Sequence, residues 1–283
     1  MADTEPAALL GTEWLADHLG DPAVRVVDGS WHLPTLDRDP KAEYVAGHIP
    51  GAVFFDIDGI ADRSNPLPHM LPDPATFAAQ VGALGLGDDA HIVAYDATGV
   101  GSAARVWWNF RVFGHHRVSV LDGGMAKWRA EGRPVETGAV EPEPARFNAR
   151  FDATLVRDLA AVRANIATGR EQVLDARAAG RFVGTEPEPR EGLRGGHIPG
   201  SHNLPFLDLY DPDTKTLKPP TELVRLYRAA GIDPDRPVVT SCGSGITACN
   251  LALGLDLIGA RRVAVYDGSW TEWGGRADTP VET

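Results

Sequence analysis

Short apolar runs that end in a polar residue occur along the whole chain and predict buried β-strands. They are Val24–Asp28, Ile92–Asp96, Val118–Asp122, Val173–Asp175, Val238–Cys242 and Val263–Asp267. Two of them are followed by a glycine-rich turn and a helical segment that ends at Gly114 or Gly259. Thr12 is predicted to be the N-cap of a helix that runs through Leu19, and Thr154 is predicted to open the matching helix of the second half. Strands that alternate with helices predict an α/β fold, a mainly parallel sheet flanked by helices on both faces.

The same motifs appear twice along the chain in the same order. GHIPG begins at Gly47 and again at Gly196, LDGGMAKW aligns with YDGSWTEW, and both halves close with PVET. Matching positions lie about 146 residues apart, which indicates two copies of one domain. We therefore predict domains at 1–140 and 154–283, joined by an extended, proline-rich linker at 141–153.

Composition and charge argue against several classes of partner and against secretion. The 283 residues have a formal net charge of -12, which argues against a nucleic-acid partner or an acidic membrane surface. No apolar run is long enough to span a bilayer, and the start MADTEPAALLGTEW has acids but no basic segment, so we expect no membrane insertion and no secretory signal. Two cysteines make neither a disulfide scaffold nor an all-thiolate zinc site, and a cytoplasmic protein is expected.

One cysteine stands where parallel sheets place their active sites. Cys242 ends a predicted strand and begins the segment CGSGITA, which leads into a helix. The two glycines allow successive backbone N–H groups to converge, and the helix N-terminus adds its positive dipole end, so the loop is expected to favour a thiolate. The alternative is a buried structural cysteine, which is the interpretation we prefer for Cys249 inside the helix.

The first copy lacks this nucleophile. Asp96 stands where the second copy has Cys242, and a carboxylate cannot take the place of a thiolate nucleophile. The first copy is therefore expected to support the fold and to contribute substrate contacts. A cysteine-dependent phosphatase is excluded, because Ala248 stands where that chemistry requires an arginine.

Taken together, the motifs resemble those of one family. GHIPG in both halves, FFDID, PHMLP, RVWWNFRVFGHH, LDGGMAKW, RFVGTEPEPR, CGSGITA and YDGSWTEW resemble the motifs of tandem rhodanese-domain sulfurtransferases, and most closely those that use 3-mercaptopyruvate. The resemblance covers nearly the whole chain and implies two rhodanese-like domains. It also implies a ping-pong reaction: Cys242 takes sulfur from 3-mercaptopyruvate as a persulfide, releases pyruvate, and passes the sulfur to cyanide, a small thiol or a reduced thioredoxin.

The resemblance also suggests roles for individual residues. It implies that Arg181 and Arg190 hold the substrate carboxylate, for which a guanidinium fork is suited. It implies that Ser244, with His69 and Asp58 behind it, assists proton transfer to the departing enolate. The remaining loop residues would surround the transferred sulfur: Gly243, Gly245, Ile246 and Thr247.

Plainer interpretations of the same residues remain open from the sequence. The two arginines could pair on the surface with Glu186, Glu188 or Glu191, and Thr247 could simply cap the helix. His69 could be an ordinary loop histidine and Asp58 a turn cap. His48 and His197, each in a GHIPG turn, are expected to make structural hydrogen bonds. Five tryptophans are expected in the cores, and they are Trp107, Trp108, Trp128, Trp270 and Trp273. We propose no metal or organic cofactor.

The charge of the Cys242 loop bears on which sulfur donor the protein uses. In the related thiosulfate sulfurtransferases the loop usually has cationic side chains for a dianionic donor, whereas here Gly243–Thr247 is neutral. A close charge pair is worth about 4 kcal/mol at an effective dielectric of about 20, so the neutral loop favours a monoanionic keto acid. Thiosulfate sulfurtransferase remains the alternative within the family. A non-catalytic scaffold or sulfur sensor is the alternative from another class, and the intact loop argues against it.

Overall fold

The computed structural model describes residues 6–283, and the chain divides into two compact units. The first unit comprises the described residues up to Asp62, Leu71–Asp152 and Asp211–Leu217. The second unit comprises Arg63–Met70, Ala153–Tyr210 and Lys218–Thr283. Each half of the chain thus contributes one short segment to the other half's unit. Residues 1–5, the beginning of the acidic N-terminal segment, lie outside the described part.

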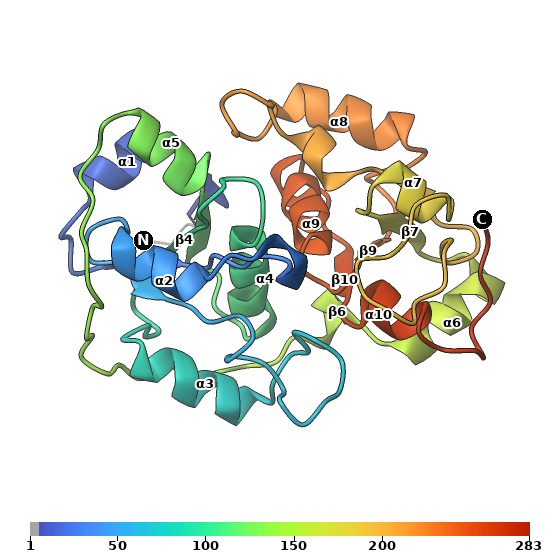
Figure 1. The fold of residues 1–283 in the computed structure, drawn as a ribbon, viewed down its shortest axis with the longest axis horizontal. Helices are drawn as coiled ribbons and strands as arrows, with labels where there is room; N and C mark the ends of the chain where they lie inside the picture. The colour runs from blue at the N-terminus through green and yellow to red at the C-terminus, as the bar shows by residue number, and fades with distance from the viewer. Residues whose placement is uncertain (1–5) are drawn as a thin grey trace. The chain divides into compact units, whose positions relative to one another are not determined.

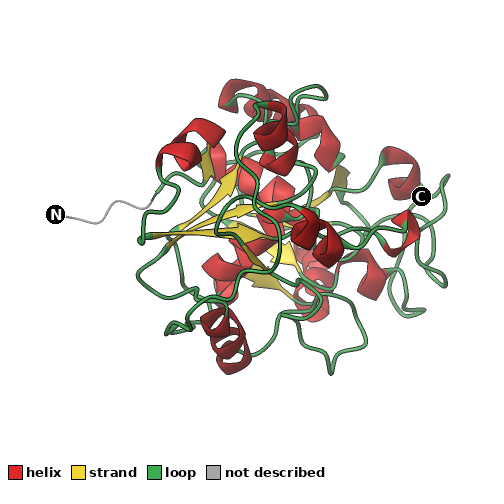
Figure 2. Ribbon diagram, turned by 60° about the vertical axis from the view of Figure 1, so that its left-hand side comes forward, coloured by secondary structure: helices red, strands yellow, loops and turns green. Residues whose placement is uncertain are grey.

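The first unit is built on a parallel sheet of five strands in the order β1-β5-β4-β2-β3. Its strands are β1 (Leu9–Leu10), β2 (Val24–Asp28), β3 (Val53–Phe54), β4 (His91–Tyr95) and β5 (Val118–Leu121). Its helices are α1 (Thr12–Asp17), η1 (Pro34–Leu36), α2 (Pro40–Ala46), α3 (Pro74–Ala83), α4 (Ala103–Val112) and α5 (Gly124–Ala130), which surround the strands (Figures 1 and 2). The register between the central strands pairs Val26 with Val93.

The second unit repeats this plan, with its five parallel strands in the order β6-β10-β9-β7-β8. Its strands are β6 (Val156–Arg157), β7 (Gln172–Asp175), β8 (His202–Asn203), β9 (Val238–Ser241) and β10 (Val263–Tyr266). Its helices are η2 (Ala153–Leu155), α6 (Leu159–Thr168), α7 (Ala179–Phe182), η3 (Phe206–Leu209), α8 (Pro220–Ala229), α9 (Ala248–Leu257) and α10 (Ser269–Trp273). The register pairs Val173 with Val239. The predicted α/β fold with two parallel sheets is confirmed.

The predicted strands match the observed ones because they are buried apolar runs. Every residue of β4 and of β9 is buried, as expected for central strands covered on both faces. The edge strands β1, β3, β6 and β8 have two residues each, too few to leave a hydrophobic pattern in the sequence.

Two predicted helix starts were wrong. Gly11 precedes α1, and Thr12 is its first residue, whose hydroxyl donates to Glu131 Oε2 at 2.7 Å. α6 begins at Leu159 rather than after Thr154, because Asp158 accepts the N–H of Ala161 and caps it. In contrast, Gly114 and Gly259 follow α4 and α9 with φ of 82° and 84°, the left-handed conformation expected of a glycine there.

The repeated GHIPG and PVET motifs meet in each unit. His48 and Glu136 form an antiparallel bridge in the first unit, and His197 and Glu282 form the same bridge in the second. His48 Nδ1 lies 2.9 Å from Tyr44 O, and His197 Nδ1 lies 2.9 Å from the carbonyl oxygen of Phe182. The prediction of structural hydrogen bonds for these histidines is confirmed. The bridges explain why motifs so far apart in each half recur together.

The segment between the two repeats is extended, and it is hydrogen-bonded to the first unit along its length. From residue 139 to residue 152 the structure has no helix or strand. The N–H groups of Ala145 and Arg150 donate to the carbonyls of Gly82 and Phe113, each at 2.8 Å, so this segment packs along the first unit.

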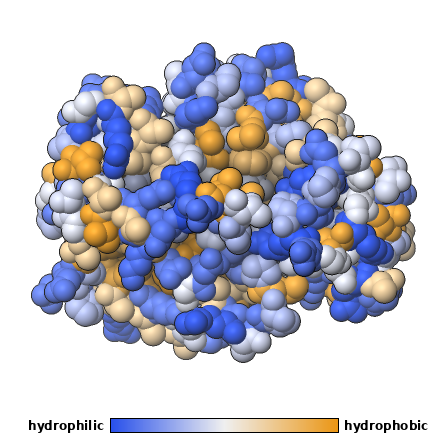
Figure 3. All heavy atoms as spheres, viewed as in Figure 1, coloured by the Kyte–Doolittle hydropathy of each residue, from blue (hydrophilic) through white to orange (hydrophobic). Residues whose placement is uncertain are grey.

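The five tryptophans predicted to lie in the cores are buried, and Trp128, Trp270 and Trp273 have no exposed surface. The face of the molecule in Figure 3 is mostly hydrophilic, with hydrophobic residues at scattered places. None of the helices between residues 6 and 283 is long and apolar enough to cross a membrane.

Candidate active site

Cys242 directly follows β9, at the carboxyl end of a central strand of the second unit. Its backbone N–H donates to Ser269 Oγ at 3.1 Å, and its carbonyl accepts the N–H of Trp270 at 2.9 Å. Only 1% of the residue is exposed. The cysteine therefore lies where the sequence predicts it, fixed at its backbone by two residues at the start of α10.

The loop after Cys242 turns its backbone toward the sulfur. Gly245 has φ of 81° and donates its N–H to Cys242 Sγ at 3.1 Å. α9 begins at Ala248, so the sulfur lies beside the N-terminal end of that helix. A backbone donor at the sulfur stabilises negative charge on it.

The first unit shows what this loop does with an anion. Both carboxylate oxygens of Asp96 accept backbone N–H groups of its own loop, from Thr98 at 3.0 Å, Gly99 at 2.8 Å, Gly101 at 3.2 Å and Ala103 at 3.1 Å. The Thr98 hydroxyl adds a further bond at 2.8 Å. The duplicated loop is therefore a cradle for negative charge, and in the first unit a carboxylate of the chain fills it.

The loops of the two units share a glycine in the left-handed conformation, three residues after Asp96 in the first and three residues after Cys242 in the second. Gly99 has φ of 78° and Gly245 has φ of 81°, and each donates its N–H to the side chain of the residue at the strand end. In the second unit that side chain is the sulfur of Cys242. The predicted anion cradle is thus observed directly in one copy, and one of its contacts recurs in the other.

Ser269 is a site residue that the sequence prediction missed. It is fully buried, has φ of 48°, and its hydroxyl donates to Tyr266 O at 2.8 Å and lies 4.0 Å from Cys242 Sγ. The first unit has Gly124 at this position, with φ of 50°. The aligned motifs contained a signal for this residue, because DGG in the first copy becomes DGS in the second. A serine at a position where the other copy has glycine indicates a backbone held in an unfavourable conformation for a functional reason.

Arg181 lies against the Cys242 loop and is held by a buried acid. Its Nε and Nη2 donate to Glu188 Oε2 at 3.2 Å and 2.5 Å. The alternative prediction, a surface ion pair of Arg181 with a nearby glutamate, named Glu188 correctly as a partner. It was wrong about the location, because the Glu188 side chain is only 1% exposed. A Cβ atom on Gly243 would lie 3.1 Å from Arg181 Nη2, which shows how closely the guanidinium approaches the loop.

A second arginine, which the sequence prediction also missed, supports this pair. Arg177 donates to Asp175 and to the other oxygen of Glu188, at 2.7 Å and 2.6 Å, and lies 4.2 Å above the ring of Trp270. Burial alone would lower the pKa of Arg177, but the two carboxylates outweigh it and raise that pKa. The two positive charges of Arg177 and Arg181 are thus balanced by the two negative charges of Asp175 and Glu188 beside the Cys242 loop.

Arg190 and His69, far apart in the sequence, meet in the second unit. Arg190 Nη2 lies 3.5 Å from His69 Nε2, and His69 is 5% exposed with φ of 62°. This contact exists because the segment Arg63–Met70 of the first half belongs to the second unit. Asp58 belongs to the first unit, where its carboxylate accepts the indole N–H of Trp31 at 2.9 Å.

The remaining loop residues differ in their surroundings. Ser244 and Ile246 are buried, 6% and 3% exposed. Thr247 is the N-cap residue of α9, as the interpretation as a helix cap requires, but its side chain makes no capping hydrogen bond. Cys249 is a buried core residue, as predicted, and its thiol donates to Gly245 O at 3.3 Å.

A family model describes both units. Residues 11–131 and 158–276 each match the rhodanese-like domain. The chain belongs to the rhodanese family. The two rhodanese matches fall on the two parallel sheets, so the sequence repeat, the fold and the family agree.

Characterised relatives are similar to this chain over nearly its whole length. It is 46% identical to 3-mercaptopyruvate sulfurtransferase from Homo sapiens over 95% of this chain and 93% of that protein. It is 45% identical to thiosulfate sulfurtransferase from Bos taurus, over 98% of this chain and 94% of that protein. The crystal structure of SseA from Escherichia coli, a 3-mercaptopyruvate sulfotransferase with the rhodanese fold, superposes with a TM-score of 0.86 at 40% identity, over 94% of this chain and 99% of that one.

The rhodanese domains differ in chemistry rather than in architecture. Only the second has a cysteine at the strand end of its loop, where the first has the self-bound Asp96 carboxylate. Between residues 6 and 283, no group of three or more histidine, cysteine or acidic side chains is arranged to hold a metal ion.

Proposed function

We propose that this rhodanese is a sulfurtransferase that takes sulfur from 3-mercaptopyruvate through a persulfide on Cys242. The observation that supports it most directly is the N–H of Gly245, which donates to Cys242 Sγ at 3.1 Å in a loop whose copy binds a carboxylate. The same environment that favours a thiolate would favour the persulfide anion that replaces it.

In the first half-reaction the Cys242 thiolate attacks the sulfur of 3-mercaptopyruvate. The new S–S bond forms as the C–S bond breaks, and the electron pair leaves with carbon as the enolate of pyruvate. The proton from the donor's thiol ends on that carbon, so Cys242 becomes a persulfide anion and pyruvate leaves. In the second half-reaction a thiolate or cyanide attacks the outer sulfur and restores the Cys242 thiolate.

Arg181 and Arg190 are proposed to hold the donor's carboxylate. Arg181 lies beside Gly243, and its guanidinium still has donors beyond those used on Glu188. Arg190 adjoins His69. We propose that Ser244, His69 and Asp58 assist the transfer of the proton to the enolate, with Ser244 nearest the sulfur along the chain.

The choice of donor depends on charge. The human and bovine relatives, at 46% and 45% identity, have different named donors, so overall similarity favours neither. The loop from Gly243 to Thr247 is neutral, and Glu188 balances the charge of Arg181. These features favour a monoanionic keto acid over the thiosulfate dianion. The ratio of kcat/KM for the two donors tests this choice, and a clear preference for thiosulfate would overturn it.

The persulfide itself is tested by mass spectrometry of the intact protein. After incubation with 3-mercaptopyruvate the protein gains one sulfur atom, which the variant Cys242→Ser does not. Cys249→Ser is the matched control, because the new hydroxyl keeps a donor for Gly245 O, and this variant should gain the sulfur as the parent does. No gain in the parent would favour the scaffold or sensor function instead.

We propose a low-molecular-weight thiol, cyanide or a thioredoxin-like protein as the acceptor. Both cysteines are thiols rather than halves of a disulfide in the structure, which fits a reducing compartment such as the cytoplasm.

A further inference from the structure

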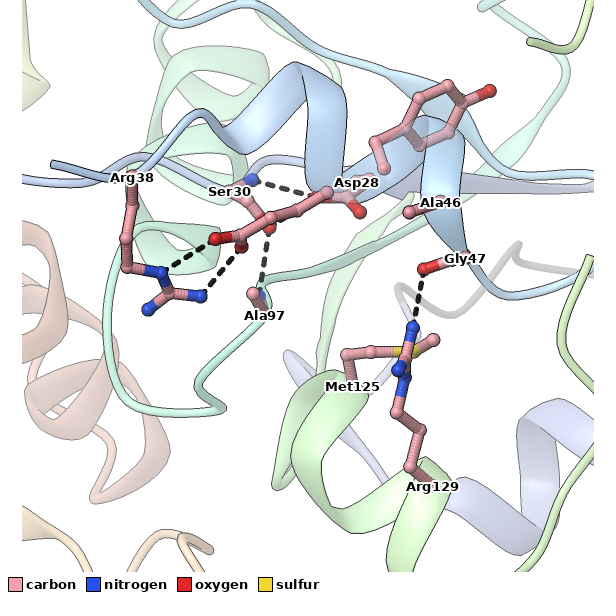
Figure 4. Close-up of a pocket in the computed structure, with 10 residues that line it drawn as sticks. Asp28, Ser30, Arg38, Ala46, Gly47, Ala97, Met125 and Arg129 are labelled. Carbon is pink, nitrogen blue, oxygen red and sulfur yellow. Dashed lines mark hydrogen bonds and ion pairs between the residues drawn. The ribbon is translucent and has the colours of Figure 1, made fainter. Parts of the chain in front are cut away.

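The first unit has a pocket of about 310 Å³ at the carboxyl ends of β2 and β4 (Figure 4). These strands are neighbours in the sheet, but the chain leaves β2 toward β3 on one side and β4 toward β5 on the other. Ligands of open α/β sheets bind in the crevice at such a point. The pocket therefore lies where the fold favours a ligand, although this unit has no nucleophile.

Two residue differences between the units leave this space open. In the second unit Arg177 and Trp270 occupy the corresponding positions, both fully buried and stacked 4.2 Å apart. The first unit has the smaller Ser30 and Met125 there, and both line the pocket. The cavity is thus the volume that an arginine and a tryptophan fill in the other copy.

The Asp96 loop is not the ligand site within this pocket. Its backbone donors are already used by the Asp96 carboxylate, so a ligand must be held by other groups. Asp28 is engaged as well, because it accepts the N–H of Ser30 at 2.9 Å and the Ser30 hydroxyl at 2.5 Å. The Ser30 hydroxyl in turn accepts the N–H of Ala97 at 2.9 Å.

The charges that line the pocket are not all balanced. Arg38 forms two hydrogen bonds with Glu43, at 2.7 Å and 2.6 Å, and this partner lowers the pKa of Glu43, so that pair is ionised and neutral overall. Arg129 makes one hydrogen bond, from Nη2 to Gly47 O at 2.9 Å. No carboxylate among residues 6–283 forms an ion pair with Arg129. Its Nε and Nη1 donors remain for a ligand, and Figure 4 shows its guanidinium beside the Met125 side chain.

We propose that this pocket binds a small organic monocarboxylate, with Arg129 as the cation that holds the carboxylate. A guanidinium suits a planar carboxylate, and the thioether of Met125 with the methyl group of Ala97 offers apolar contact to the rest of the molecule. A dianion fits less well, because one unbalanced cation faces it while Glu43 and Asp28 lie nearby.

Methionine methyl resonances test the proposal residue by residue. The chain has three methionines, of which Met125 lines the pocket and Met70 belongs to the second unit beside His69. In protein labelled at the methionine methyl carbon, pyruvate should shift the Met125 resonance in a saturable manner, and uncharged pyruvamide should not. Because Met70 reports on the second unit separately, loss of sulfurtransferase activity and loss of binding here are distinguishable.

The variant Arg129→Gln should weaken the pyruvate-dependent shift of Met125 by about tenfold or more, since a charge-assisted pair is lost. Its melting temperature should stay that of the parent, because Arg129 makes a single hydrogen bond. Arg225→Gln removes an equivalent charge from an exposed position of α8 and should leave the shift unchanged. The proposal is overturned if pyruvate leaves Met125 unmoved, if Arg129→Gln retains the shift, or if inorganic phosphate or pyruvamide matches pyruvate.

Discussion

Arg190 Nη2 lies 3.5 Å from Nε2 of His69, a residue from the other half of the chain. The two are brought together because Arg63–Met70 belongs to the second unit. A guanidinium next to a buried histidine, in the unit that contains the proposed nucleophile Cys242, supports a role in substrate binding more than a role in stability.

Replacement of Arg190 by glutamine should therefore affect binding first. We expect KM for 3-mercaptopyruvate to rise about tenfold to a hundredfold, as for a lost hydrogen bond to a charged group, with little change in melting temperature. Steady-state kinetics and thermal unfolding on the same preparation check this, with Arg225→Gln as the charge control. Unchanged kinetics together with a large fall in melting temperature would show that Arg190 is only a structural residue.

The backbone conformation of Gly245 gives a sharper test of the sulfur environment. Gly245→Ala places a side chain at φ of 81°, at a cost of about 1–2 kcal/mol, and moves the N–H that contacts Cys242 Sγ. We expect kcat/KM to fall about a hundredfold or more, as when a preorganised donor is removed from an active site.

Gly259→Ala is the matched control for that variant. Gly259 has φ of 84°, and no atom lies within 4 Å of a Cβ built there, so it has the same strain without contact to the loop. Both variants should lose similar stability in urea unfolding, and only Gly245→Ala should lose activity. Equal activity losses would mean that strain alone explains the effect.

Glu188 links two arginines, so its charge should matter for both stability and binding. Glu188→Gln leaves Arg177 and Arg181 with a buried excess of positive charge, and we expect the free energy of unfolding to fall by about 3 kcal/mol. KM for 3-mercaptopyruvate should also change, because Arg181 loses the partner that orients it. Glu186→Gln, on an exposed neighbour, should stay within about 0.5 kcal/mol of the parent. A stable Glu188→Gln protein with unaltered KM would contradict this assignment.

A buried histidine in the first unit predicts how stability depends on pH. Burial, together with the nearby charge of Arg117, lowers the pKa of His91 to about 4. The unfolded chain binds this proton near pH 6.5, before the folded chain does, so stability is complete above about pH 6.5 and falls as the pH drops toward 4, by at most about 3 kcal/mol.

The measurement is urea unfolding at about pH 7.5 and about pH 5. His91→Gln keeps a donor for Ser119 Oγ, which His91 Nε2 contacts at 2.8 Å, and should reduce the loss of stability between the two conditions. A smaller dependence should remain, because burial also lowers the pKa of His115. An identical pH dependence in parent and variant would exclude His91 as the source.

Much of the fold could be predicted because local patterns of apolar residues and turn residues specify it. β2 was predicted at its observed bounds, and the repeat predicted a second parallel sheet before any contact was known. The helix starts at Thr12 and Thr154 were predicted less well, because several polar residues near each end can cap a helix and local sequence does not choose among them. Two-residue edge strands depend on pairing with a neighbour, which no local pattern reports.

The sequence by itself determined the duplicated α/β architecture, the position of Cys242 at a strand end, and the replacement of that cysteine by Asp96 in the first copy. Burial patterns and turn residues are local properties, so a single chain reveals them. Only the tertiary structure decided that Ser269 contacts the cysteine, that Glu188 joins Arg177 to Arg181, and that Ser30 and Met125 leave a pocket open. Those outcomes depend on which distant side chains share one buried space, and that is settled only when each unit folds and packs its own core.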